Sequence, residues 1–204
     1  MFIIVFQSNK NGILVSRKKR VRESIDWVRV VLRILVAYYS DSGNTEKIAR
    51  AIYEEVSVGN QAQLKKIKDV KTEDFSDYDV VFVGGPCQVN DLASPVKKLL
   101  NLVPVSPKFK LAGFFTHMSP SGAKGSYERC IDSFEKIRKE KKIDFKGYYE
   151  CQGKPTPQVE QFVRKSMNVP EDVFKKGMAE AKNHPSAEDL KKAKEFARGI
   201  VSKK

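Results

Sequence analysis

ILVAYYSDSGNTEKIARAIYEEV, residues 34–56, places an apolar strand directly before a hydroxyl-rich turn and an amphipathic helix. At the start of such a helix, unpaired backbone N–H groups and the positive end of the dipole converge on one spot. Ser40, Ser42 and Thr45 add hydroxyl groups around that spot. The stretch therefore predicts a site for a phosphate group.

Two other interpretations of this turn are open. A nucleoside triphosphate loop requires G-x-x-x-x-G-K-[ST], and no lysine follows Gly43 at that spacing. An ordinary strand-to-helix turn with a Ser or Thr cap has the same local pattern. The turn alone does not separate a phosphate site from a simple cap, so the decision rests on the rest of the chain.

Composition indicates one globular domain with an additional arm. The chain has 204 residues, of which 41% are hydrophobic, and its apolar runs are far shorter than the roughly 20 residues of a membrane span. The N-terminal MFIIVF is too short for a signal-peptide core and has no basic region before it. We therefore expect a cytoplasmic protein.

The cysteines and histidines argue against a metal centre. Cys87, Cys130 and Cys151 are far apart and form no C-x-x-C, and the chain has only His117 and His184. These spacings match no zinc or iron–sulfur site, and they suggest free thiols. Redox chemistry in this chain would therefore need an organic cofactor.

The chain is strongly basic, with a formal net charge of +13. Residues 1–33 contribute eight Lys or Arg against two acidic residues. This balance permits anionic partners. The basic run Arg17–Arg22 has no interleaved aromatic residues, so we expect no specific nucleic-acid site.

Strands alternate with helices along most of the chain, which is typical of a doubly wound α/β fold with helices on both faces of a parallel sheet. The strands are expected at 33–39, 61–68, 79–83, 110–116 and 145–151. The helices are expected at about 45–56, from 94 onward, at 127–140 and from 186 onward, where Ser186 and Asp189 form a capping-box pattern.

Two segments lie outside this alternation. Residues 152–185 hold two amphipathic pieces, near 159–167 and 171–182, and are expected to form a helical lid or flank. Residues 1–30 form a basic extension that fits a hairpin and helix, a flexible arm, or a translated stretch upstream of the true start. We favour an extension without function, and we assign residues 31–204 to the main domain.

The residues of the first turn resemble the flavodoxin signature. The matching positions are Tyr39, Ser40, Ser42, Gly43, Asn44, Thr45, Ala49 and Ile52. The resemblance implies a five-stranded parallel sheet of order 2-1-3-4-5 that binds FMN, and it covers about residues 33–151 and the last helix. In this fold the ligand lies beyond the carboxyl ends of the strands where the strand order reverses, and flavodoxin is the standing example of that rule.

The loops after the third and fourth strands are therefore expected to hold the flavin ring. Paired Gly84 and Gly85 are expected to let the backbone approach the ring closely, and neither loop carries a Trp or Tyr. By the resemblance, FMN would contact Ser40, Asp41, Ser42, Gly43, Asn44 and Thr45 through its phosphate, Pro86, Cys87, Gln88, Val89 and Asn90 on one side of its ring, and Thr116, His117, Met118, Ser119 and Gly122 on the other.

Three functions fit these expectations. The first is a non-covalent FMN protein that carries electrons to and from a redox partner protein and needs no catalytic side chain. The second is an FMN-dependent NAD(P)H:quinone-type oxidoreductase, whose small-molecule acceptor would stack on a ring left open by the missing aromatic residues. The third is a cofactor-free module that binds polyanions through its basic surface.

Overall fold

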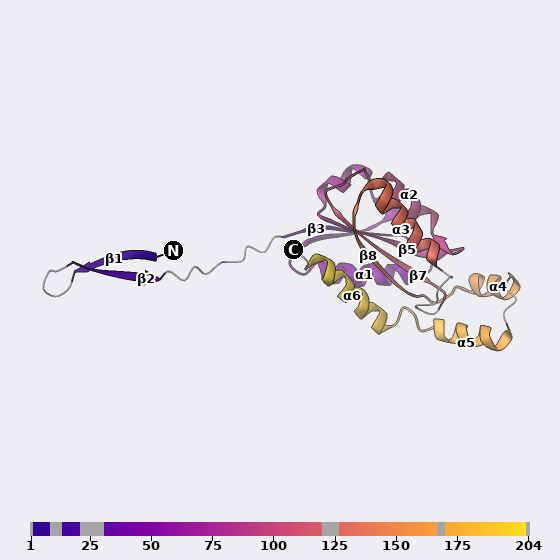
Figure 1. Cartoon of the computed structure of the whole chain (residues 1–204). Coiled ribbons are helices and arrows are strands. Elements are labelled where there is room, and N and C mark those ends of the chain that lie inside the picture. Colours follow the sequence, from indigo (N-terminus) through magenta and orange to yellow (C-terminus); the bar gives the residue numbers. More distant parts are fainter. Residues whose placement is uncertain (1, 9–13, 21–30, 120–126, 167–169, 203–204) are drawn as a thin grey trace. The chain divides into compact units, whose positions relative to one another are not determined.

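The computed structural model describes residues 2–8, 14–20, 31–119, 127–166 and 170–202. The chain divides into two compact units, residues 1–30 and 31–204. In the first unit, β1 (Phe2–Ser8) pairs with β2 (Leu14–Arg20) as an antiparallel hairpin (Figure 1). The helix that one interpretation placed after this hairpin lies outside the described residues.

The second unit contains a parallel sheet of strand order β4-β3-β5-β7-β8 (Figure 1). Its strands are β3 (Arg33–Tyr38), β4 (Gln61–Lys66), β5 (Val80–Gln88), β7 (Lys110–His117) and β8 (Asp144–Gln152). Numbered within this sheet, the order is 2-1-3-4-5. The predicted flavodoxin-like doubly wound fold is confirmed.

Helices cover both faces of this sheet. One apolar core lies between the sheet and two adjacent helices, α1 (Asn44–Val56) and α6 (Ala187–Val201). The other core lies beneath α2 (Ser94–Leu102) and α3 (Glu128–Lys141) on the opposite face (Figure 1). Alternate residues of β3 enter opposite cores, as Leu35 and Val36 do, which explains why the strand is a continuous apolar run.

The third strand of the parallel sheet differs from its predicted form. β5 continues through the glycines to Gln88, which we had assigned to a loop, and turns back into β6 (Asp91–Leu92). Val89 and Asn90 form the two-residue turn with φ of 52° and 62°. A type I′ hairpin turn requires positive φ at both central residues, and glycine usually occupies at least one of these positions. The sequence QVND contains no glycine, so it does not predict this turn.

The predicted second strand of the parallel sheet is also too long. β4 ends at Lys66, and two short 3₁₀ turns, η1 (Ile67–Asp69) and η2 (Thr72–Asp77), follow it. β4 is an edge strand that alternates between exposed and half-buried residues. β4 therefore lacks a continuous run of buried apolar residues that would extend its pairing with β3 beyond Lys66.

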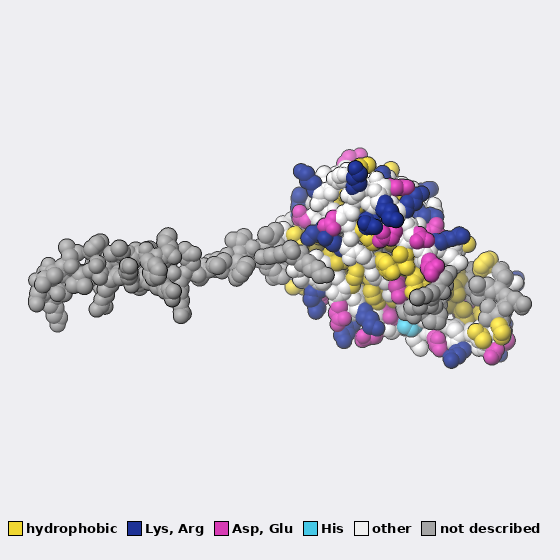
Figure 2. Space-filling model, viewed as in Figure 1, with side chains coloured by type: hydrophobic (Ala, Val, Ile, Leu, Met, Phe, Trp, Pro, Cys, Tyr) yellow, Lys and Arg dark blue, Asp and Glu magenta, His cyan; other side chains and the backbone are white. Residues whose placement is uncertain are grey.

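The segment between β8 and α6 forms two helices, α4 (Pro157–Ser166) and α5 (Glu171–Ala181). In the part of the chain that the structure describes, no helix is both long and apolar enough to cross a membrane. On the face in view, basic and acidic side chains of the 31–204 unit are interspersed (Figure 2). The net positive charge is therefore not gathered into a single patch on that face.

Candidate functional site

The turn between β3 and α1 has the form of an anion site. Gly43 precedes α1 with a φ of +85°, and its N–H donates a 3.1 Å hydrogen bond to Ser40 Oγ. The N–H groups in the first turn of α1 have no carbonyl partners within the helix. The turn therefore offers backbone donors and the positive end of a thirteen-residue helix to a negatively charged group.

The hydroxyl groups of this turn divide between two roles. Ser40 and Ser42 remain at the turn, and Ser42 Oγ accepts a 3.0 Å hydrogen bond from Asn44 Nδ2. Thr45 is buried, and its hydroxyl lies 2.8 Å from the Thr116 hydroxyl at the end of β7. Thr45 therefore joins α1 to the sheet, rather than adding a free hydroxyl to the turn as we expected.

Gly84 and Gly85 are required by packing. A Cβ atom on Gly84 would lie 2.3 Å from the Phe114 ring, and one on Gly85 would lie 2.3 Å from Val96 Cγ2. Both distances are far below van der Waals contact. The glycines thus let β5 fit between β7 and α2, and the predicted close approach of this backbone to a ring stays a prediction.

A cavity of about 260 Å³ lies where the carboxyl ends of the strands meet α1. It is lined by Asp41, Ser42, Asn44, Pro86, Cys87, Gln88, Thr116, His117, Met118, Gly153, Lys154, Pro155, Thr156 and Val159. This set includes nine of the sixteen predicted cofactor residues. Ser40, Gly43 and Thr45 belong to the adjoining turn, Val89, Asn90 and Ser119 do not line the cavity, and Gly122 lies outside the described residues.

Hydrogen bonds connect the turn to the first ring loop. Asp41 accepts from the Tyr39 hydroxyl at 2.5 Å and from Gln88 Nε2 at 2.9 Å. The first of these bonds raises the pKa of Tyr39, because the hydroxyl must remain protonated to donate. Asp41 therefore holds the turn against the end of β5 at one side of the cavity.

His117 is fixed by residues that the sequence did not indicate. Its Nε2 lies 2.5 Å from Glu150 Oε2 on β8, and its ring stacks on Tyr127 with centroids 4.2 Å apart. The imidazole is almost wholly buried, and Nδ1 has no hydrogen-bond partner among the described residues. In a neutral imidazole whose Nε2–H donates to the carboxylate, Nδ1 is a hydrogen-bond acceptor, and it has no donor among the described residues.

The segment after β8 also contributes to the site. Asn44 Nδ2 donates a 2.7 Å hydrogen bond to the Lys154 carbonyl, and a Cβ on Gly153 would lie 2.9 Å from that same amide nitrogen. We had assigned this segment to a lid or flank. The sequence could have indicated this contribution, because the segment directly follows the last strand. It must therefore begin at the carboxyl ends of the strands, where the other loops of the site also lie.

A larger groove of about 790 Å³ lies along β8 and the start of α6. The polar residues at its α6 end already have partners, since Asp189 Oδ2 accepts from the Ser186 N–H at 2.6 Å and from His184 Nδ1 at 2.5 Å. These bonds cap α6. The groove also lies away from the point where the strand order reverses, so it is the weaker candidate for a ligand site.

A family model described as a flavodoxin domain matches residues 35–198. This chain belongs to the flavodoxin domain family. Members of this family typically bind FMN and transfer electrons to redox partners. Within the family, the chain is 29% identical over 189 residues to the flavodoxin-like domain-containing protein BilS of Clostridioides difficile, covering 84% of this chain and 98% of that protein.

Solved flavodoxins share the fold of this family member. Oxidised flavodoxin 2 from Bacillus cereus aligns with a TM-score of 0.56 and 19% identity, over 83% of this chain and 96% of its own. A flavodoxin from the domain Archaea aligns with a TM-score of 0.54 and 16% identity, over 83% and 96%. At these identities the likeness establishes the architecture, so the site must be argued from its own residues.

The residues present fit a flavin nucleotide. The glycine turn and the start of α1 suit a phosphate, and the cavity beside them is reached by the loops on both sides of the strand reversal. The unpartnered, buried Nδ1 of His117 matches a ligand that carries an N–H donor. Among the described residues, no group of three or more His, Cys, Asp or Glu is arranged to hold a metal ion.

Proposed function

We propose that this flavodoxin-family chain binds FMN non-covalently in the 260 Å³ cavity and carries electrons between partner proteins. The observation that carries this proposal is the Ser40–Thr45 turn at the start of α1, directly beside that cavity. The flavin supplies the redox chemistry when it is bound. The protein then has to bind it, orient it and exclude water.

Each of these tasks has residues suited to it. The backbone N–H groups of the turn bind the phosphate, and the Asp41–Gln88 hydrogen bond keeps the two neighbouring loops in place. His117, fixed by Glu150, offers an acceptor to the ring from the end of β7. Segment 153–159 lines the cavity next to Asn44 and limits the access of water.

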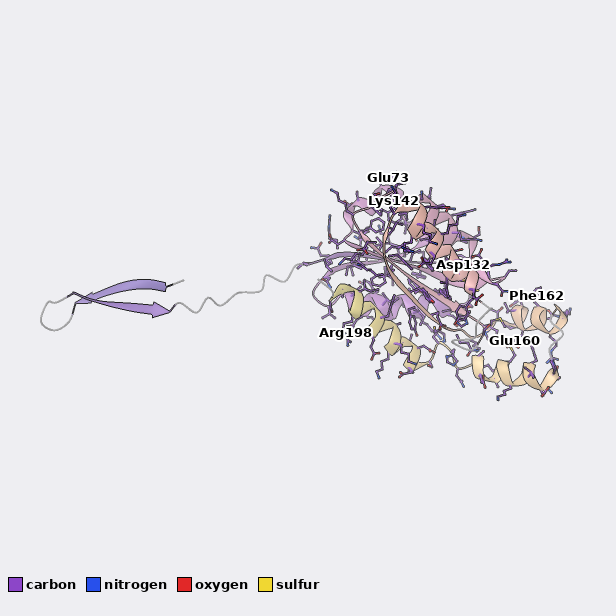
Figure 3. The ribbon with its side chains drawn as sticks, in the orientation of Figure 1. Glu73, Asp132, Lys142, Glu160, Phe162 and Arg198 are labelled. Atoms are coloured by element: carbon purple, nitrogen blue, oxygen red, sulfur yellow. The ribbon has the colours of Figure 1, made fainter. Side chains whose placement is uncertain are left out.

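The direct test is to incubate the purified protein with FMN, remove unbound ligand and record the visible absorbance. Ser42→Glu places a carboxylate beside the phosphate and should weaken binding by about fivefold or more, since like charges at such distances repel by about 1–4 kcal/mol. Ser76→Glu is the matched control, because Ser76 is exposed on η2 and its hydroxyl donates a hydrogen bond to the carbonyl of nearby Glu73, which is labelled in Figure 3. A protein that retains no flavin, or two variants with the same affinity, would refute the assigned site.

An FMN-dependent NAD(P)H:quinone-type oxidoreductase is the second candidate function. It is favoured by the two ring loops, which present no Trp or Tyr to cover the ring among their described residues. Rapid NAD(P)H oxidation with a benzoquinone would support the oxidoreductase. Negligible turnover by a protein that holds FMN would support the carrier, whose electrons need a partner protein.

A further inference from the structure

Two cysteines from distant parts of the sequence meet at the edge of the cavity. Cys87, near the end of β5, lines the cavity and is partly exposed, whereas Cys130, in the first turn of α3, is buried. Cys87 packs against the buried cluster that contains Cys130, and the Cys130 side chain is the neighbour with the largest effect on the pKa of the Cys87 thiol. The two thiols are therefore neighbours although 43 positions separate them in the sequence.

This contact is held by the packing of α3 on β6. Cys87 pairs with Leu92 of β6, and the adjacent Asp91 accepts a 2.8 Å hydrogen bond from Ser133 Oγ, which lies one helical turn after Cys130. Asp91 also accepts a 2.6 Å hydrogen bond from Lys97 Nζ. The β5–β6 hairpin is thereby tied to α3 through Ser133 and to α2 through Lys97.

The two thiols are chemically unequal. The Cys130 side chain lowers the pKa of Cys87, against the opposing effects of burial and of the Asp91 charge. The pKa of Cys130 is raised, because the Cys87 side chain and burial both favour its protonated form. Cys87 is thus the accessible nucleophile, and Cys130 is placed as the thiol that attacks second.

We propose that Cys87 and Cys130 form a redox-active dithiol beside the cofactor cavity, which small-molecule disulfides oxidise to an intramolecular disulfide. This site lies beyond the proposed FMN chemistry and does not require bound flavin. In the reverse direction, a small-molecule dithiol restores both cysteines.

The oxidation proceeds by two thiol–disulfide exchanges. The Cys87 thiolate attacks one sulfur of the small-molecule disulfide, forms a mixed disulfide and releases one thiolate. Cys130 then gives up its proton and attacks the Cys87 sulfur, which forms the Cys87–Cys130 bond and expels the second small thiolate. The protein loses two protons and two electrons, which the small-molecule disulfide takes up to become two thiols.

The full chain, incubated with oxidised glutathione and then digested with trypsin under non-reducing conditions, tests this proposal. Lys97, Arg129 and Lys146 separate the three cysteines into different peptides. We expect two of the three thiols to be lost and the Cys87 and Cys130 peptides to be joined. A Cys130→Ser variant should stop at one glutathione on Cys87, and a Cys87→Ser variant should leave Cys130 reduced.

Cys151→Ser is the matched control, because Cys151 is buried in the other core and burial raises the pKa of its thiol. This variant should form the same Cys87–Cys130 link as the parent. An oxidised parent without the linked peptides, or with Cys151 in the link, would overturn the proposal. The parent protein alone decides this point, even if a cysteine variant fails to fold.

Discussion

Gly43 shows how one residue shapes the turn at the start of α1. Its φ of +85° lies in the left-handed region, which L-residues with a Cβ seldom adopt. The surrounding space is open, since a Cβ at this position would meet no atom within 4 Å. The glycine is therefore required by the backbone conformation, unlike Gly84 and Gly85, which are required by packing.

A Gly43→Ala variant should consequently lose about 1–2 kcal/mol of unfolding free energy from backbone strain alone. Urea unfolding measures this loss. Gly199→Ala is the matched control, because Gly199 is an exposed position in α6 with open space around it. The control should gain about 0.5–1 kcal/mol, because alanine favours a helix interior. Equal shifts in the two variants would contradict a role for the positive φ.

At the scale of an element, α6 is held at its start by a reciprocal capping box. Ser186 Oγ accepts from the Asp189 N–H at 3.2 Å, and the Asp189 carboxylate accepts from the Ser186 N–H. Burial alone would raise the pKa of Asp189, but the hydrogen bonds from Ser186 and His184 outweigh it and leave that pKa lowered. The charged carboxylate is therefore the form that stabilises the helix.

A carboxyl group whose pKa is lowered in the folded state stabilises the protein above its unfolded pKa, near 4, and this stabilisation is lost as the pH falls through the folded pKa. Asp189→Asn should thus cost about 1.5–3 kcal/mol at pH 7, and the difference from the parent should shrink below about pH 4. Urea unfolding at several pH values measures both effects.

Glu188→Gln is the control for this prediction, because Glu188 is exposed and forms a 3.9 Å ion pair with Lys192 at the surface of the same helix. Exposed pairs of this kind contribute little, so we expect a change below about 1 kcal/mol at every pH. If the Asp189→Asn deficit stayed constant down to pH 2, the carboxylate charge would not be its cause.

For the whole molecule, the division at residues 30 and 31 has a consequence for stability. Both apolar cores and every residue that lines the cavity fall within residues 31–204. The β1–β2 hairpin belongs to the separate compact unit of residues 1–30. The α/β unit should therefore fold and bind its ligand without the extension.

A chain that begins at Val31 should show the same melting temperature as the full chain to within about 2 °C and the same affinity for FMN. Its retention on a heparin column should decrease, because the deletion removes seven Lys or Arg and two acidic residues. Calorimetry and salt elution provide the two measurements. A large fall in melting temperature would show that the extension supports the core, and unchanged heparin retention would place polyanion binding on the α/β unit.

The sequence by itself determined the order of strands and helices, the glycine turn before α1 and the capping box at Ser186. Each of these features depends on a short contiguous stretch of sequence, which is recognised by its apolar periodicity or by a few residues at a fixed spacing. The predicted element boundaries were less accurate at β4 and β5, where pairing with neighbouring strands decides where a strand ends.

Only the tertiary structure decided the contacts that complete the site. The pairs Cys87–Cys130, His117–Glu150 and Asn44–Lys154 each join segments more than 30 residues apart, and no local pattern encodes which side chains meet. The parallel sheet brings these segments together because all its strands end at one edge. Local stretches of sequence therefore specify the elements, and the packing of distant segments specifies the chemistry at that edge.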